Sequence, residues 1–258
     1  MIIRSATFNV NSVRSRMPIL ERWLPVSGVD MLFLQETKVI DADFPTAPFE
    51  AMGYRVFFKG EKSYNGVAAA VKDGIKANVS YGFDDGDEPD FPTRVLLLRT
   101  GDLTVLNTYV PQGKEIEHPD FEVKKRFLAR VRKIIEREIK GKFLWVGDIN
   151  VAPTEIDVTN PKDKKNHVCF CQEIRDCFER TREGLTDLLR VFHPEAGVYT
   201  FFDYRVKNAL ARGIGWRIDL ALASPSLAEK AKDCFADTEP RGWERPSDHT
   251  PLIVDIDI

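Results

Sequence analysis

Two polar side chains end an apolar run near the middle of the chain. Residues 143–147 (FLWVG) read as a buried strand, and Asp148 and Asn150 stand two residues apart at its end. Because alternate residues of a strand point to the same face, both side chains can converge on one ion or phosphate while Ile149 stays in the core. This spacing predicts a site at the tip of a strand.

The same arrangement recurs at other apolar runs. A single Asn or Asp at a strand end is usually a cap or turn residue, but its repetition along the chain favours one shared site. The further candidates are Asn9 and Asn11 after the first run, Glu36 after residues 32–35, Asp219 within residues 216–219, and Asp248 and His249 before the last run.

Carboxylates and amides, without several histidines or paired cysteines, are the donor set of a site for a hard cation such as Mg²⁺ or Mn²⁺. Such ions bind substrate phosphates, so phosphoryl transfer or phosphodiester hydrolysis is the first reaction class to consider. The sequence has no Walker loop, no G-x-G-x-x-G motif and no serine nucleophile elbow. These absences argue against an NTPase, a dehydrogenase and a serine hydrolase.

Strand patterns outnumber helical ones, and together they predict a layered α/β protein. The pattern predicts a helix over 121–139 with apolar residues on one face, and its basic residues are expected on the opposite, solvent-exposed face. Further helices are expected around 19–24 and over 171–182. The expected strands cover residues 2–8, 31–35, 54–58, 67–71, 95–99, 103–109, 143–149, 217–223 and 252–258.

Composition favours one globular domain over residues 1–258, because 43% of residues are hydrophobic and no linker-like segment divides the chain. No apolar run is long enough to cross a bilayer and no signal peptide is recognised, so a cytoplasmic protein is expected. The four cysteines, Cys169, Cys171, Cys177 and Cys234, are expected to be free thiols. A structural zinc site with His167 is the less favoured alternative.

The net charge of −3 conceals local cationic patches. Residues 204–218 contain four cations, Arg205, Lys207, Arg212 and Arg217, and no acidic residue. Aromatic residues flank them, which suits contacts with sugars and bases. A second cluster at 162–165 is equally well read as a solvated face.

Seven motifs give the chain a family resemblance. In order along the sequence they are 7–14 (TFNVNSVR), 34–38 (LQETK), 64–68 (YNGVA), 107–113 (NTYVPQG), 147–153 (GDINVAP), 215–219 (GWRID) and 247–249 (SDH). Together they resemble exonuclease III, within the endonuclease/exonuclease/phosphatase superfamily. The segments at 109–112 and 199–219 are similar to its DNA-repair branch.

The resemblance implies a four-layer α/β sandwich, with two packed mixed β-sheets flanked by helices. It implies a monomeric, metal-dependent enzyme that acts on double-stranded DNA, hydrolysing the phosphodiester 5′ to abasic sites. It also implies 3′-to-5′ exonuclease activity and removal of 3′-phosphate or phosphoglycolate blocks.

The motifs also imply roles for single residues. Glu36 and Asp248 would hold the Mg²⁺ or Mn²⁺ ion, Asp148 would orient or deprotonate the attacking water, and Asn150 would help to fix that water and the phosphate. His249, paired with Asp219, would stabilise charge on the phosphate as an imidazolium. Tyr109 would act as a hydrogen-bond donor or as a phenolate, and the donor is favoured because a phenol ionises only near pH 10. The residues expected around the ion are Asn9, Asn11, Glu36, Asp148, Asn150, Asp248 and His249.

Contacts with DNA are implied in the same way. Phe201, Trp216 and Ile218 would line a small apolar pocket for the flipped abasic nucleotide, although ordinary core packing is the alternative for these side chains. Arg205 would probe or wedge the duplex. Arg14, Lys38 and Gln112 would contact the backbone or bases.

Three departures from the motifs affect details: Phe8 in place of a frequent tryptophan, Phe201 at a position where the aromatic type varies in the family, and a long acidic stretch at 84–90. A non-catalytic nucleic-acid-binding relative is the alternative function. The retained carboxylates, amides and histidine favour the enzyme. A phosphatase for lipid or nucleotide headgroups would better suit a chain without the cations at residues 204–218 and the aromatic residues that flank them.

Overall fold

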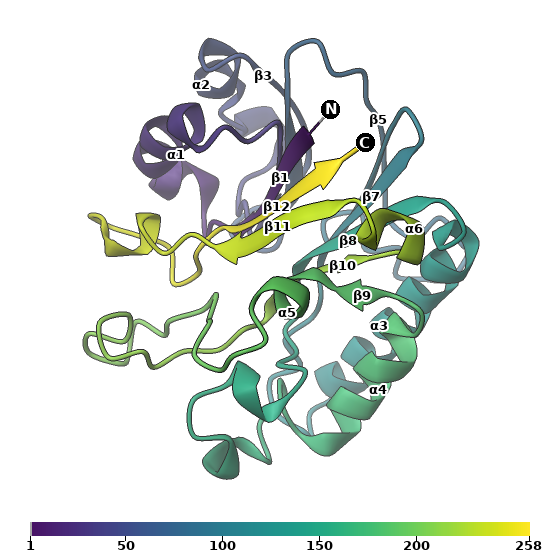
Figure 1. The fold of residues 1–258 in the computed structure, drawn as a ribbon, viewed down its shortest axis with the longest axis vertical. Helices are drawn as coiled ribbons and strands as arrows, with labels where there is room; N and C mark the ends of the chain where they lie inside the picture. The colour runs from purple at the N-terminus through teal and green to yellow at the C-terminus, as the bar shows by residue number, and fades with distance from the viewer. Residues whose placement is uncertain (1) are drawn as a thin grey trace.

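The computed structural model describes residues 2–258, which form two six-stranded mixed β-sheets (Figure 1). The first sheet has the order β11-β12-β1-β2-β4-β3 and the second the order β5-β6-β7-β8-β10-β9. The first contains β1 (Ile2–Asn9), β2 (Met31–Gln35), β3 (Tyr54–Lys59), β4 (Val67–Lys72), β11 (Ala231–Ala236) and β12 (Leu252–Asp257). The second contains β5 (Asn78–Tyr81), β6 (Val95–Thr100), β7 (Leu103–Tyr109), β8 (Lys142–Asp148), β9 (Thr186–Asp187) and β10 (Asp219–Ala223).

Helices cover the outer face of each sheet (Figure 1). The first sheet carries α1 (Val13–Ser27) and α2 (Thr46–Ala51), and the second carries α3 (Pro119–Glu138) and α4 (Gln172–Arg182). Two shorter helices are α5 (Leu188–Phe192) and α6 (Pro225–Ala228). Short 3₁₀ segments occur at Asp41–Asp43, Glu155–Asp157, Pro161–Lys164 and Pro240–Gly242.

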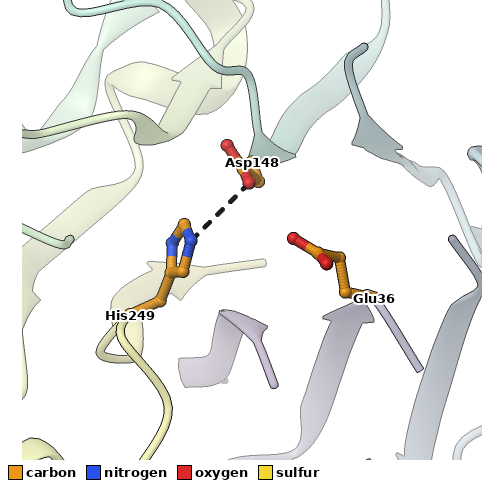
Figure 2. A group of neighbouring side chains, drawn as sticks. All are labelled: Glu36, Asp148 and His249. Atoms are coloured by element: carbon orange, nitrogen blue, oxygen red, sulfur yellow. Dashed lines mark ion pairs between the residues drawn. The ribbon is translucent and has the colours of Figure 1, made fainter. Parts of the chain in front are cut away.

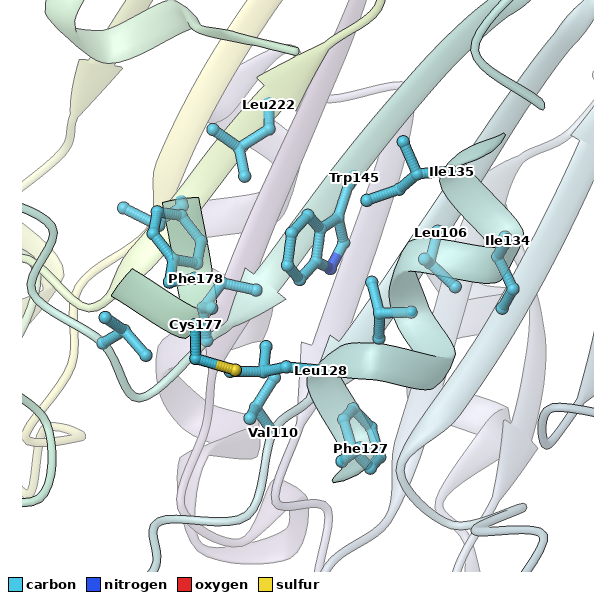
Figure 3. Packing of buried hydrophobic residues seen from close by; sticks show 14 of the residues in the cluster. Leu106, Val110, Phe127, Leu128, Ile134, Ile135, Trp145, Cys177, Phe178 and Leu222 are labelled. Carbon is cyan, nitrogen blue, oxygen red and sulfur yellow. The ribbon is translucent and has the colours of Figure 1, made fainter. Parts of the chain in front are cut away.

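Three apolar clusters hold these layers together. The inner faces of the two sheets meet through residues such as Phe33 and Val105, all removed from water. A second cluster lies between the second sheet and α3 and α4, where Trp145 packs near Phe178 and Leu128 (Figure 3). A third joins α1 and α2 to the first sheet. The predicted four-layer sandwich is therefore confirmed.

Strand register brings the polar strand ends to one edge of the sandwich. β1 and β2 are parallel, so Asn9 pairs with Gln35, directly before Glu36. β7 and β8 are also parallel, and β10 runs antiparallel to β8, which pairs Asp219 with Asp148. Because β12 runs antiparallel to β1, its beginning lies beside the end of β1.

One expectation about α3 is wrong for two of its basic residues. Lys124 is fully buried and Arg130 is 8% exposed, whereas the sequence pattern predicts both on the solvent-exposed face of the helix. Arg130 donates to Asp85 and to the carbonyls of Asp87 and Pro89, so it fastens the acidic stretch onto α3. Among residues 2–258, no helix is long and apolar enough to cross a membrane.

Candidate active site

Five side chains from both sheets meet at the edge where the strand ends converge. Asn9 ends β1, Glu36 follows β2, Asp148 ends β8, Asp219 begins β10 and His249 precedes β12. Figure 2 shows Glu36, Asp148 and His249 pointing toward one another. The site therefore draws on both halves of the sandwich.

The backbone at this edge adopts conformations that aim the side chains inward. Asn11, Glu36 and Asn150 have φ values of 44°, 53° and 53°, in the left-handed region. Such conformations cost free energy and tend to cluster at functional sites. Gly147 has φ 133°, and a Cβ there would lie 2.0 Å from the Thr108 carbonyl oxygen, so only glycine lets β8 approach β7 just before Asp148.

Asn9 links the carboxylates of the two sheets. Its Nδ2 donates to Glu36 Oε1 at 2.8 Å and to Asp148 Oδ2 at 2.9 Å. The Asn11 N–H donates to Asn9 Oδ1 at 3.0 Å, which fixes the amide of Asn9 in this orientation. Asn9 therefore holds Glu36 and Asp148 in a defined relation.

His249 lies between two aspartates. Its Nδ1 is 2.8 Å from Asp219 Oδ2, and its Nε2 is 3.8 Å from Asp148 Oδ2. Burial alone would lower the pKa of His249, but the charge and hydrogen bond of Asp219 outweigh it and raise the pKa to about 10. At neutral pH the ring is therefore an imidazolium held by Asp219.

The two neighbouring carboxylates differ in acidity. Burial, opposed by His249 and reinforced by Asp219 and Glu36, raises the pKa of Asp148 to about 7. Burial also acts to raise the pKa of Glu36, but hydrogen bonds from Asn9 and Lys38 lower it overall. Asp148 is thus suited to take up a proton near neutral pH, while Glu36 stays ionised.

Asp248 belongs to a second polar chain beside these groups. It accepts a hydrogen bond from Asn11 Nδ2 at 3.0 Å. Lys38 Nζ donates to Asn11 Oδ1 and lies 2.8 Å from Glu36 Oε2. Asp248 and Glu36 therefore line one cleft and are connected through Asn11 and Lys38.

The amide of Asn150 is fixed beside Asp148. Its Nδ2 donates to the Val110 carbonyl at 2.9 Å, and its backbone N–H donates to Asp148 Oδ1 at 3.0 Å. Its Oδ1 lies 3.9 Å from the Cys169 thiol. The Asn150 side chain is therefore held in one orientation at the cleft.

The Tyr109 hydroxyl keeps its proton at neutral pH. Burial and the charges of Glu36 and Asp148 raise its pKa well above 10. The guanidinium of Arg94 lies over the Tyr109 ring, 4.5 Å from its centre, and donates to the Tyr109 carbonyl at 3.1 Å. This agrees with the expectation of a hydrogen-bond donor, and it identifies Arg94 as a neighbour that no motif indicated.

A cleft of about 380 Å³ opens onto these groups. Phe201, Trp216 and Ile218 line it together, and the Phe201 ring centre lies 5.0 Å from that of His249. Phe201 and Trp216 remain partly exposed, whereas Ile218 is buried in a small apolar cluster. These side chains are at once packed and accessible from the cleft, so core packing alone does not describe them.

The remaining predicted residues lie at different distances from the cleft. Gln112 and Arg205 line it, and Arg205 is paired with Asp203 at 2.7 Å. Arg14 is exposed on the first turn of α1 and does not line the cleft. The full set of predicted residues that line it is Glu36, Tyr109, Gln112, Asp148, Asn150, Phe201, Arg205, Trp216, Ile218, Asp248 and His249.

One of the four cations at residues 204–218, Arg217, does not belong to a DNA-binding surface. Its side chain is 0% exposed, and it pairs with Asp157 at 2.6 Å and Asp187 at 2.8 Å. It therefore fastens the segment before Asp219 from inside the protein and cannot contact DNA. The run of cations in the sequence could not show that Arg217 is buried, because both of its partners are distant in the chain.

Four residues of the cleft were not assigned to it from the sequence, namely Lys164, His167, Cys169 and Asp203. Lys164 belongs to the cluster that was read as either a solvated or a binding face, and its Nζ lies 5.7 Å from the centre of the Trp216 ring. The His167 ring lies 4.6 Å from that of Trp216. Burial, with Lys124 and Lys164, lowers the pKa of His167 to about 4, so this ring is neutral.

The zinc alternative finds no support in the described part of the chain. All four cysteines are free and buried. Between residues 2 and 258, the group with metal-ligand spacing is Glu36, Asp148 and His249, whose ligand atoms lie within 4.8 Å of one another. The structure thus shows an acidic candidate metal site at the cleft.

The donor set of this group fits a hard divalent cation. Glu36 and Asp148 supply carboxylate oxygens, which Mg²⁺ and Mn²⁺ prefer. His249 is less suited to be a ligand, because its Nδ1 is engaged by Asp219 and the ring carries a proton at neutral pH. The residues therefore fit an ion held by oxygen atoms.

Comparison with known proteins gives the family. Residues 6–249 match the model of the endonuclease/exonuclease/phosphatase family. The chain is 34% identical to exodeoxyribonuclease III of Haemophilus influenzae, over 97% of this chain and 98% of that protein.

Solved structures of similar proteins agree with this family assignment. An AP endonuclease from Archaeoglobus fulgidus has a TM-score of 0.95 and 44% identity, covering 99% of this chain and 100% of that one. A 3′ phosphatase from Neisseria bound to a product DNA hairpin has a TM-score of 0.93 and 34% identity, with the same coverage. The expectation of a nuclease-type enzyme is confirmed, and the chain belongs to the endonuclease/exonuclease/phosphatase family.

Proposed function

We propose that this protein is a divalent-metal-dependent DNA-repair nuclease that hydrolyses the phosphodiester 5′ to abasic sites in duplex DNA. It also acts as a 3′-to-5′ exonuclease and removes blocking groups from 3′ ends, with residues 1–258 as one catalytic domain. The observation that carries the proposal is the placement of Asp148 between the Glu36 carboxylate and a His249 imidazolium that Asp219 holds. Relatives named as an exodeoxyribonuclease, an AP endonuclease and a 3′ phosphatase support it.

The residues of the chain divide the chemistry among them. Asp148, with a pKa of about 7, accepts a proton from the attacking water. The fixed Asn150 amide orients that water and the phosphate. The His249 imidazolium and the Tyr109 hydroxyl meet the negative charge that grows on the phosphate oxygens in the transition state.

Glu36 and Asp248 are the proposed principal ligands of the ion, with Asn9, Asn11, Asp148, Asn150 and His249 around it. When bound, Mg²⁺ or Mn²⁺ would neutralise phosphate charge and stabilise the leaving 3′ oxygen. The products are a 3′-hydroxyl and a 5′-deoxyribose phosphate.

The apolar lining of the cleft supports selectivity for abasic sites. An abasic nucleotide has little stacking to lose, so it leaves the duplex at low cost. Phe201, Trp216 and Ile218 form an apolar wall beside the catalytic groups, and in this proposal the wall excludes a normal base. Arg205 is exposed and pairs with Asp203 at the surface, so it can exchange this partner for a phosphate or wedge the duplex at little cost.

The test is incision of a labelled duplex that carries one reduced abasic analogue. The proposal predicts a single cut on the 5′ side in Mg²⁺ or Mn²⁺ and none in EDTA. Matched substrates with a 3′-phosphate or an ordinary recessed 3′ end report the other two activities. A protein that binds this duplex but leaves it intact in Mg²⁺ and Mn²⁺ would be the non-catalytic relative instead.

A further inference from the structure

Lys124 is a buried cation that the reaction described above does not use. It belongs to α3, which packs on the outer face of the second sheet, and its side chain is 0% exposed. Lysine is rarely buried completely, because removing an ammonium group from water is costly unless its protons are bonded. The partners of Lys124 therefore indicate what holds it there.

Three backbone carbonyls from three separate segments accept hydrogen bonds from the Lys124 ammonium group. The distances from Nζ are 3.1 Å to the Gln112 oxygen, 2.7 Å to the Asn150 oxygen and 2.8 Å to the Val168 oxygen. An ammonium has three protons, so these three bonds use its full donor capacity. The Cys169 sulfur lies further away, at 3.9 Å.

Each of these segments contributes a wall of the catalytic cleft. Gln112 follows β7, Asn150 follows β8, and Val168 lies between His167 and Cys169. Gln112, Asn150, His167 and Cys169 all line the cleft. Lys124 thus joins three walls from behind, without reaching the cleft itself.

Charge pairing does not explain the burial of Lys124. The ion pairs found between residues 2 and 258 do not include it, in contrast to Arg130 on the same helix, which pairs with Asp85. Hydrogen bonds from a charged donor to a carbonyl are stronger than those from a neutral donor. A carbonyl left buried without a donor destabilises the folded protein. Gly113, with φ 98°, would place a Cβ 3.4 Å from Lys124 Cδ, so the turn after Gln112 packs closely against this side chain.

We infer that Lys124 is a positioning residue of the nuclease reaction, which fixes the Asn150, Gln112 and His167–Cys169 segments relative to one another. The inference rests on the proposed function, because Asn150 is the group through which Lys124 acts on the reaction. Its effect is expected in kcat more than in KM, since small displacements of a positioned group cost rate in the transition state.

The test replaces Lys124 by methionine, which is similar in length but has no donor. We expect kcat per folded molecule to fall by about 10-fold to 100-fold on the abasic duplex, with KM changed by less than about 3-fold. Lys124→Arg keeps the charge and several N–H donors, and should recover part of the loss. Folded fraction is measured by circular dichroism and by thermal unfolding of each variant.

Arg130→Met is the matched control. Arg130 is a buried cation fewer than two helical turns further along α3. It also donates to backbone carbonyls, but to those of Asp87 and Pro89 in the acidic stretch at 84–90. The control should lower stability while leaving kcat per folded molecule within about 2-fold of wild type. A difference between the two variants separates positioning from general stability.

The outcomes are distinct. Wild-type protein without incision activity would refute the proposed function itself. Active wild type with unchanged kcat per folded molecule in Lys124→Met would overturn the inference, and so would an equal loss in Arg130→Met. If Lys124→Met does not fold, Lys124→Gln, whose amide has two N–H donors, takes its place; unchanged kcat in that variant would likewise overturn the inference.

Discussion

The Nδ1 atom of His249 lies 2.8 Å from Oδ2 of Asp219, and both side chains are buried. This contact keeps a positive charge at the base of the cleft, where a phosphate group would develop negative charge. It also joins the second sheet, which carries Asp219, to the loop that leads into the first.

Asp219→Asn should lower kcat by about 100-fold or more, because a preorganised charge that stabilises the transition state is lost. Asp219 contributes the largest of the effects that raise the pKa of His249, ahead of the charges of Asp148 and Asp248. Without the Asp219 carboxylate this pKa falls, and burial shifts the ring toward its neutral form. The measurement is single-turnover incision of the abasic duplex, with thermal unfolding as the control for folding. A variant that folds and cuts at the wild-type rate would refute the role of this pair.

The pH profile of kcat/KM should have two limbs. Activity rises with pH as Asp148 ionises, and its pKa is about 7 in the metal-free protein. A bound cation stabilises the ionised carboxylate, so higher Mg²⁺ concentration should move this limb to lower pH. Activity falls again near pH 10, where His249 loses its proton. A rising limb that does not respond to Mg²⁺ would count against a position of Asp148 beside the ion.

Tyr109→Phe removes the hydroxyl but keeps the ring under Arg94. Because the pKa of Tyr109 lies well above 10, the hydroxyl acts as a donor throughout the working range. We expect kcat to fall by about 10-fold to 100-fold, with DNA affinity nearly unchanged. Binding is followed by fluorescence anisotropy in Ca²⁺ and rate by quenched flow. Loss of affinity without loss of kcat would place Tyr109 in ground-state binding instead.

Arg217→Met tests the buried ion pairs before β10. Removing Arg217 leaves the buried Asp157 with Arg190 as a partner and takes away the cation paired with the partly buried Asp187. The free energy of unfolding should therefore fall by about 3 kcal/mol, the lower end of the cost of breaking a buried ion pair. Exposed Lys207→Met should change it by less than about 0.5 kcal/mol. Urea denaturation measures both. Equal stability of the two variants would contradict a structural role for Arg217.

Trp216→Ala tests the apolar wall of the cleft. The ring packs near His167 and shares the cleft with Phe201 and Ile218. Its removal should raise KM for the abasic duplex and reduce the preference over a duplex with a normal base at the same position. If selectivity is unaffected, the wall does not determine which nucleotide enters.

The sequence predicted the sheets well where apolar runs are long. Residues 31–35 and 103–109 are strands with the bounds expected for them. The sequence does not predict β5, β9 and β11, which all lie at sheet edges. β9 has two residues, and β5 and β11 are largely half-exposed or exposed, so none of them gives a long apolar run. The helices α2, α5 and α6 are short and give little periodicity.

The sequence predicts those site residues that end strands or lie in motifs. Asp148 and His249 are examples, and the structure brings them to 3.8 Å of each other. Lys124 and Arg217 could not be assigned, because a charged residue reads as exposed until its partners are known. Those partners are backbone carbonyls or carboxylates many residues away.

The most direct test of the account is single-turnover incision of the abasic duplex in Mg²⁺ by Asp148→Asn and Glu36→Ala. Both substitutions act on the carboxylates that Asn9 holds together, and both variants should fold. The account predicts that each rate falls by about 1000-fold or more, and that EDTA abolishes incision by the wild type. Incision within about 10-fold of wild type in both folded variants, or incision that survives EDTA, would contradict it.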